Sequence, residues 1–161
     1  MDSFDIDIGH GRSLCIEATE KGVDFNSYSP IPSGKVVKVS AKSIHLDINC
    51  WKKFNDNIDL VTEGFKILTE DSDTGGEFSL YLGKSLFVRA ISSVNCVNIR
   101  RYYFDKQDKI YKPGRPGVSF KISEFEELLT YVNDINDVTK IDTVSSCCEI
   151  DTQSDCKICN P

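Results

Sequence analysis

A segment that occurs twice is the feature of this chain that most constrains its fold. Residues 11–18 (GRSLCIEA) align without a gap with residues 83–90 (GKSLFVRA), so that small, polar and apolar positions agree in order. After a difference of two residues in length, the apolar positions of residues 23–54 fall on those of residues 97–128. The chain therefore contains two copies of one unit, and its fold has to accommodate that repeat.

The repeat divides the 161 residues into four parts. Two units are predicted over residues 4–62 and 78–138, with an acidic linker over residues 63–77 and an acidic tail that contains cysteines over residues 139–161. A unit of about 60 residues buries only about 60% of its unfolded surface and is marginal alone. We therefore expect a monomer in which the units share a core as an intramolecular pseudo-dimer. The alternatives are two independently folded copies and a homodimer.

The first part of the second copy has the two-residue period of β-strands. Residues 86–91 and 96–103 are rich in β-branched and aromatic side chains and are predicted to form a hairpin. Two shorter strands are predicted over residues 109–112 and 117–122, with Pro113 and the following glycine as a break between them. Four short antiparallel strands are expected.

The end of each copy is predicted as a helix because its apolar positions follow a helical period. In the second copy, Ser123 and Glu126 have the spacing of a capping box. In the first copy, Asn49 takes the place of the cap. The apolar stripe contains Phe125, Leu128, Leu129 and Val132 in the second copy and Trp51, Phe54 and Ile58 in the first. Each copy thus has β-β-β-β-α order, and the protein is predicted to be α+β.

The net charge of -6 conceals a strong segregation of charge along the chain. Residues 83–121 contain nine basic and two acidic residues, a net charge of +7, which leaves -13 for the remainder. One segment is therefore suited to a polyanion that the rest of the chain repels. The alternative is that basic and acidic stretches only pair with each other within the fold.

Several classes of protein are excluded by what the sequence contains. No apolar run approaches the roughly 20 residues that span a bilayer, and the acidic amino terminus lacks the features of a secretory signal. We therefore expect an intracellular protein with no membrane contact that is not secreted. The sequence has no phosphate-binding loop, dinucleotide-binding motif or nucleophile elbow, and neither His10 nor His45 has a suitable carboxylate or cysteine near it in the sequence. We expect no enzymatic activity and no cofactor.

Seven cysteines in a chain without a secretory signal are expected to be mostly reduced thiols. Four of them lie in the acidic tail, where thiolates can bind zinc tetrahedrally at about 2.3 Å. Their spacing is not that of a familiar zinc knuckle, and the polar surroundings fit a flexible tail at least as well. We expect no metal, and the alternative is a zinc site formed by Cys147, Cys148, Cys156 and Cys159.

The second copy also contains a series of short motifs in a fixed order. They are Gly83-Lys84, VNIRRYY over residues 97–103, KPGRPGVSF over residues 112–120 and a helix that ends in VNDI at residues 132–135. Over residues 82–137 the chain resembles the carboxyl-terminal domain of the positive cofactor four family. Members of that family are transcriptional coactivators that bind single-stranded DNA. The resemblance implies paired units, each with a curved four-stranded sheet and a long helix, with DNA along the β-surfaces.

The resemblance also implies which residues contact nucleic acid. Basic residues of the second copy would contact phosphates, and Tyr103 would stack on a base. The candidate nucleic-acid-binding residues are Lys84, Arg89, Arg100, Arg101, Tyr103, Lys112 and Arg115. A positive groove with aromatic faces is also what holds single strands in general. The alternatives are that Tyr103 is packed in the core and that the arginines are solvated charges at a sheet edge.

The first copy has lost most of these charges and matches the family only weakly. Glu17 stands where the second copy has Arg89, and Asn26 stands where it has Arg100. We therefore expect the first copy to be a structural partner. The residues that would extend a nucleic-acid path on its side are Lys35, Lys38 and Lys42.

The predicted function is binding of single-stranded nucleic acid, DNA before RNA, through a basic β-surface in transcription or replication. Residues 91–95 lack the aromatic residue and lysines of the family, and Pro116 replaces a basic residue, so a weaker affinity or a different ligand is expected. The partners would belong to the transcription or replication machinery, in the nucleus or, for a viral chain, at a viral replication site. The alternative is a protein-interaction module of the same fold that docks polymerase or another factor, with little nucleic-acid binding.

Overall fold

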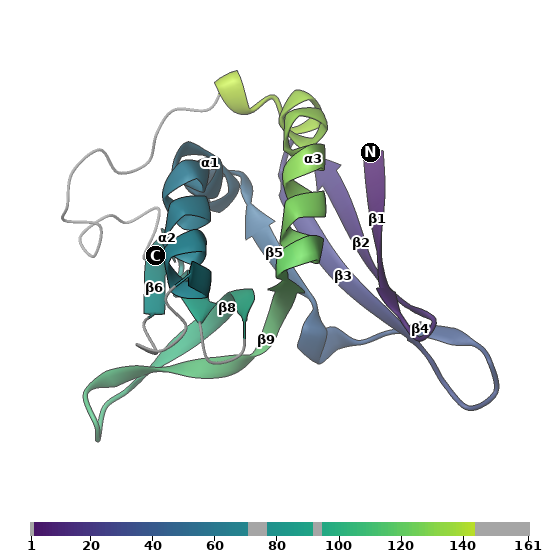
Figure 1. Ribbon diagram of the computed structural model, residues 1–161, viewed down its shortest axis with the longest axis horizontal. Helices are drawn as coiled ribbons and strands as arrows, with labels where there is room; N and C mark the ends of the chain where they lie inside the picture. Colours follow the sequence, from purple (N-terminus) through teal and green to yellow (C-terminus); the bar gives the residue numbers. More distant parts are fainter. Residues whose placement is uncertain (1, 71–76, 92–94, 144–161) are drawn as a thin grey trace.

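The computed structural model describes residues 2–70, 77–91 and 95–143, and within them the protein is α+β with two antiparallel sheets and three α-helices (Figure 1). Each repeated unit contributes one sheet. Among the described residues, no helix is long and apolar enough to cross a membrane.

The first sheet belongs to the first copy and has the strand order β1-β2-β3-β4, with β5 also paired to β3. Its strands are β1 (Asp2–Gly9), β2 (Arg12–Thr19), β3 (Gly22–Pro30), β4 (Val36–Lys38) and β5 (Ile44–Asp47). The short strands β4 and β5 pair with opposite ends of β3 and are separated by a 3-10 turn, Ser40–Lys42. Together they occupy the place of a single fourth strand.

The second sheet has the order β6-β7-β8-β9. Its strands are β6 (Glu77–Gly83), β7 (Leu86–Ile91), β8 (Cys96–Asp105) and β9 (Ile110–Lys121). Strand β6 was not predicted from the sequence. The prediction of two separate strands over residues 109–112 and 117–122 is wrong, because β9 is one continuous strand. Pro113 does not interrupt β9 because β9 is an edge strand, where a missing N–H is tolerated.

The predicted helices are present, but their beginnings differ from the prediction. In the first copy, the helix is split into α1 (Ile48–Asp56) and α2 (Ile58–Glu70), and the cap is Asp47, which accepts from the Cys50 N–H at 2.9 Å. The prediction of Asn49 as the cap is therefore wrong. Because α2 extends to Glu70, residues 63–70 of the predicted linker are helical.

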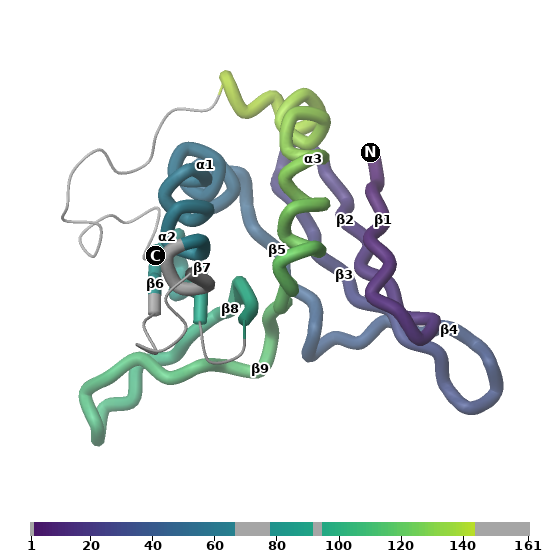
Figure 2. The backbone as a smooth tube through the Cα atoms, viewed as in Figure 1, coloured from purple at the N-terminus to yellow at the C-terminus, as the bar shows by residue number. Residues whose placement is uncertain are grey.

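The helix of the second copy, α3 (Ile122–Thr139), follows directly from β9 (Figure 2). It begins one residue before the predicted cap Ser123. The carboxylate that reaches back is that of Glu124, which accepts from the Lys121 N–H at 2.8 Å, so the predicted role of Glu126 is wrong. After α3, Ile141 is buried in a short 3-10 turn, Ile141–Thr143.

The two units exchange their helices. Helix α3 of the second unit contacts β1 and β2 of the first sheet, while α2 of the first unit contacts β6 and β7 of the second (Figure 1). The rings of Phe4 and Tyr131 lie 5.2 Å apart across the first contact. In the second contact, α2 comes so close that a Cβ on Gly64 would lie 2.6 Å from the Phe78 ring.

A single hydrophobic core joins both units. It contains buried residues from both sheets and all three helices. Phe25 of the first sheet and Phe120 of the second meet edge to face, with ring centroids 6.0 Å apart. The shared core of an intramolecular pseudo-dimer, expected from the repeat, is present.

Candidate nucleic-acid interface

The outer face of the second sheet, which points away from the helices, carries a row of aromatic side chains. In β7, Leu86, Val88 and Ala90 are buried toward the core, so the alternate residues Phe87 and Arg89 project to the outer face. Rings from all four strands meet there. This aromatic row consists of Tyr81, Phe87, Tyr102, Phe104 and Tyr111.

The rings of the aromatic row are in direct contact. The Phe87 centroid lies 4.9 Å from that of Tyr81, 5.1 Å from that of Tyr102 and 5.6 Å from that of Tyr111. Phe104 and Tyr111 are 5.4 Å apart. Tyr102 is only 6% exposed, but Phe104 and Tyr111 are 50% and 52% exposed. The row therefore has a packed base and an end that offers two apolar rings to a ligand.

A register shift between β8 and β9 positions this exposed end. Arg100 pairs with Gly117 and Tyr102 with Pro113, so residues 114–116 lie opposite Arg101. Three residues of β9 thus lie opposite one residue of β8, an excess of two. Because this excess is even, residues that pair beyond the shift still project to the same face of the sheet as before it. The β8–β9 hairpin then extends away from the helices (Figure 2), and Phe104 and Tyr111 on it are exposed.

Three of the candidate arginines donate hydrogen bonds to hydroxyl or carbonyl oxygens. Arg89 donates to the Tyr102 hydroxyl at 2.8 Å, and its guanidinium carbon lies 5.5 Å from the centroid of that ring. Arg100 donates to the carbonyl oxygens of Gly114 at 3.1 Å and Arg115 at 2.6 Å. Arg101 donates to the Lys84 carbonyl at 2.7 Å. Carbonyl and hydroxyl acceptors orient a guanidinium but do not neutralise it.

Two of the candidate lysines are neutralised by carboxylates. Lys84 forms an ion pair with Asp47, the cap of α1 in the other unit, and this hydrogen bond raises the pKa of Lys84. Lys112 lies 2.8 Å from Asp105 and 2.6 Å from Asp108, whose hydrogen bonds raise its pKa. The alternative that basic and acidic groups pair within the fold thus applies to these two lysines.

Tyr103 and Arg115, the remaining candidates, are exposed on the hairpin. Tyr103 is 54% exposed, so the alternative that it is packed in the core is wrong. It pairs with Lys112 on the face of the hairpin opposite to the aromatic row, since neighbouring residues of a strand point in opposite directions. No side-chain hydrogen bond or ion pair of Arg115 occurs within the described part of the chain.

None of the five members of the aromatic row was among the candidate residues from the sequence, which included the neighbouring Tyr103 instead of Tyr102. Phe104 directly follows the predicted strand 96–103, and Tyr111 lies inside the predicted strand 109–112. The two-residue period of the first strand puts Phe104 on the same face as Tyr102. Tyr81 was missed because β6 was not predicted. Phe87 was aligned with Cys15 in the repeat but was not considered as a surface residue.

A groove of about 440 Å³ lies between the two sheets, where β9 runs beside the 3-10 turn of the first unit. We call it the seam groove. Its basic lining residues are Arg12, Lys42, Arg100 and Lys121. Lys42 therefore lies at a place that a ligand can reach from the second unit, whereas Lys35 and Lys38 are not among the lining residues.

The outer face of the first sheet is acidic rather than basic. Glu17 and Asp24 are cross-strand partners, and Asp5 and Asn26 flank Cys15 on the neighbouring strands. Burial, together with the nearby Asp5 and Glu17, raises the pKa of the Cys15 thiol to about 11. Tyr28 and its cross-strand partner Lys38 also lie on this face, but no cluster of rings like the aromatic row occurs among its described residues.

Metal binding has no site among the described residues, which contain no group of three or more His, Cys, Asp or Glu side chains able to hold an ion. Cys15, Cys50 and Cys96 are free thiols. The alternative zinc site at Cys147, Cys148, Cys156 and Cys159 lies outside the described residues.

Comparison with known proteins gives little further information. No protein-family model and no curated protein matches the chain. Among solved structures, the chain is similar to a Trypanosoma bruciei MRP1/MRP2 crystal structure, with a TM-score of 0.36 and 11% sequence identity over 83% of this chain and 82% of that one. The fold described above therefore stands on the topology of this chain alone.

Proposed function

We propose that the protein binds single-stranded nucleic acid, DNA before RNA, on the outer face of the second sheet. The observation that carries this proposal is the aromatic row, whose exposed rings Phe104 and Tyr111 lie on a surface that also holds Arg89 and Arg100. Stacking on aromatic rings contributes about 1–3 kcal/mol per base and tolerates any sequence.

The charges around the row support a polyanionic ligand. Arg100, on the same face as the row and Arg89, donates to the backbone carbonyls of Gly114 and Arg115, which do not neutralise its charge. Arg101 donates to the Lys84 carbonyl and lies on the opposite face of β8, on the side of Tyr103. Lys106 and Lys109 are exposed at the tip of the β8–β9 hairpin. Unpaired bases can reach rings on an open sheet, whereas the bases of a duplex are stacked inside it.

The resemblance of the second copy to the positive cofactor four family supports the same ligand. On that resemblance we propose a role in transcription or replication, together with proteins of that machinery, in the nucleus or at a viral replication site. The role is one of binding and not of catalysis. Tyr103 remains part of the proposal as a second stacking surface on the opposite side of the hairpin.

Titration of the full chain with labelled single-stranded DNA, the matching duplex and the matching RNA tests the proposal. We expect the single strand to bind more tightly than the duplex. The logarithm of the affinity should fall linearly with the logarithm of the salt concentration. Phe104→Ala with Tyr111→Ala should weaken binding without changing the salt dependence, because stacking releases no ions. Leu60→Ala, which removes an apolar side chain that is 53% exposed on α2, is the control.

The outcome that would overturn the proposal is equally clear. If the wild-type chain binds no oligonucleotide at low salt, the exposed rings of the hairpin serve another purpose. The interaction module that docks a protein factor then becomes the better explanation, since Phe104, Ile110 and Tyr111 form an exposed apolar surface.

A further inference from the structure

The seam groove has the properties of a channel for a sugar–phosphate chain. Four basic side chains line it, from both units: Arg12 and Lys42 from the first, and Arg100 and Lys121 from the second. The lining also includes the apolar Ile8 and Val118. Sugar–phosphate segments combine charge with apolar surface, so a lining of this kind suits them.

The charges of the groove are available to a ligand. Within the described residues, none of the four basic side chains forms an ion pair with a carboxylate. Arg12 donates only a long hydrogen bond, 3.4 Å, to the Gly9 carbonyl. The carboxylate among the lining residues is that of Glu124, which is 9% exposed and caps α3 through the Lys121 N–H.

The groove adjoins the aromatic row at Arg100. Arg100 lines the groove and is the cross-strand partner of Phe87, the central ring of the row. A ligand that leaves the row at Phe87 therefore meets Arg100 next and then the groove. Arg12 is the counterpart of Lys84 in the repeat, but unlike Lys84 it forms no ion pair within the described chain.

Beyond the groove, the first sheet repels a polyanion. Glu17 and Asp24 occupy the positions that Arg89 and its partner Asn98 occupy in the second sheet, and Asp24 Oδ1 lies 2.7 Å from His45 Nδ1. Burial is the largest cause of the raised pKa of the Cys15 thiol, and the carboxylates of Asp5 and Glu17 on this face raise it further. A nucleic-acid strand that continued past the groove along the outer face of the first sheet would meet the carboxylates of Asp5, Glu17 and Asp24.

We infer that a bound single strand runs from the aromatic row into the seam groove and ends there, so that Arg12 and Lys42 of the first unit contact phosphates and each chain binds one strand. This inference rests on the proposed function. It makes the pseudo-dimer functionally asymmetric: the first unit supplies one wall of the channel and blocks the continuation of the strand.

The test uses the full chain and an oligothymidylate of about 16 nucleotides, at the upper end of common site sizes. The variant Arg12→Ala with Lys42→Ala removes the charges of the first unit from the groove. We expect weaker binding. The slope of log affinity plotted against log salt concentration should also be smaller in magnitude by about 1.4, because each phosphate contact on a single strand contributes about 0.7 to that slope. Calorimetry on the wild type should give one strand per chain.

The control is Lys21→Ala with Lys35→Ala, which removes the same formal charge from exposed positions of the first unit outside the groove. It should leave the slope unchanged. An equal loss of slope in both variants would overturn the inference in favour of a general charge effect. If the alanine variant does not fold, Arg12→Gln with Lys42→Gln replaces it.

The failure of this inference and the failure of the proposed function give different results. If the wild-type chain does not bind the oligonucleotide, the proposed function fails. If the wild type binds and the groove variant keeps its affinity and slope, only the channel is wrong. Two strands bound per chain would overturn the single continuous path.

Discussion

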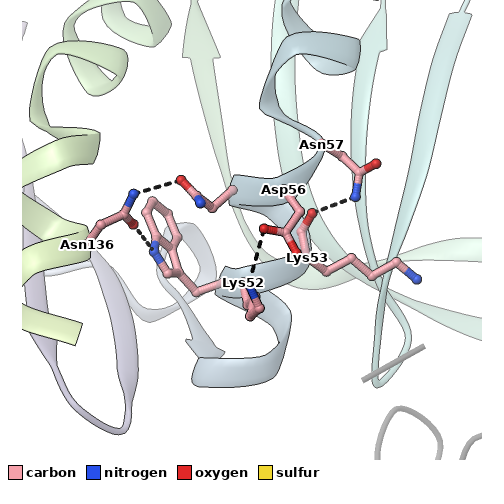
Figure 3. A network of polar contacts seen from close by, with 7 residues as sticks. Lys52, Lys53, Asp56, Asn57 and Asn136 are labelled. Atoms are coloured by element: carbon pink, nitrogen blue, oxygen red, sulfur yellow. Dashed lines mark hydrogen bonds and ion pairs between the residues drawn. The ribbon is translucent and has the colours of Figure 1, made fainter. Parts of the chain in front are cut away.

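Asn136 in α3 accepts a hydrogen bond from the indole nitrogen of Trp51 in α1 at 2.9 Å, and this contact connects the two repeated units (Figure 3). The amide nitrogen of Asn136 also donates to the Asn55 side-chain oxygen at 2.8 Å. Trp51 is fully buried. A buried indole N–H needs an acceptor, and here the acceptor comes from the other unit.

We expect Asn136→Ala to destabilise the protein by about 1–3 kcal/mol, because it leaves the buried Trp51 N–H and the Asn55 amide without their partner. Urea unfolding monitored by tryptophan fluorescence measures this. The control is Asn133→Ala, an exposed position on the same helix, which should cost less than about 0.5 kcal/mol. Equal effects of the two substitutions would show that the bridge contributes nothing specific.

The exchange of helices predicts the state of association. Since α2 and α3 cover the sheet of the other unit within one chain, the apolar stripes of these helices are buried inside the monomer as far as the structure describes their side chains. Light scattering at micromolar concentration should give the monomer mass of 18.1 kDa. A species of about twice that mass would show that the helices are exchanged between chains, as domain swapping permits.

The sequence was informative about local features and less so about pairings between distant residues. The repeat, the strands around Val88 and Ile99 and the helix stripe at Phe125 follow from local periodicity, so these elements were predicted. Asparagine and aspartate cap helices about equally well, so the residue types alone do not decide between Asn49, which was predicted as the cap of α1, and Asp47. Pairing of β5 with β3 extends the strand through Asp47, and that long-range pairing decides between them.

The same distinction applies to the candidate interface. The basic segment and Tyr103 were identified from composition and resemblance. Lys84 was assigned to phosphate contact, but its partner Asp47 lies 37 positions earlier in the chain and belongs to the other unit. No local pattern reveals such a partner. The aromatic row depends on the register of four strands, which the sequence does not specify.

The neutralised lysines and the available arginines should differ in their effect on nucleic-acid binding. Arg101→Ala with Arg115→Ala is expected to reduce the slope of log affinity against log salt concentration (the salt slope) for a single strand by about 1.4 in magnitude if both residues contact phosphates. Lys84→Ala with Lys112→Ala removes the same formal charge, but these lysines are paired with Asp47, Asp105 and Asp108 and should leave the slope nearly unchanged. Fluorescence anisotropy at several salt concentrations measures both slopes.

The opposite order of effects would contradict this prediction. If the lysine pair lowered the slope and the arginine pair did not, the ion pairs would have to open when the ligand binds. The phosphates would then contact Lys84 and Lys112 in place of Asp47, Asp105 and Asp108.

The ion pair between Lys84 and Asp47 predicts how stability depends on pH. Burial opposes ionisation of Asp47, but hydrogen bonds from Lys84 and the Cys50 N–H outweigh it and hold the pKa below its ordinary value of 3.8. The unfolded chain therefore takes up a proton at higher pH than the folded one, and the stabilisation is present above pH 3.8 and lost as the pH falls through the lower folded pKa. Lys84→Met should remove less than about 1 kcal/mol near pH 7, since the lysine is partly exposed.

Urea unfolding of the wild type and of Lys84→Met between pH 7 and pH 2 measures this contribution. The difference in unfolding free energy should be constant above pH 5, shrink as Asp47 becomes protonated, and approach zero once the carboxyl is neutral in both proteins. Lys35→Met, at an exposed position with no carboxylate partner in the described structure, should show no such trend. A difference that stayed the same down to pH 2 would mean that the Lys84 side chain stabilises the junction between the units by packing, and that its charge is free to meet a phosphate.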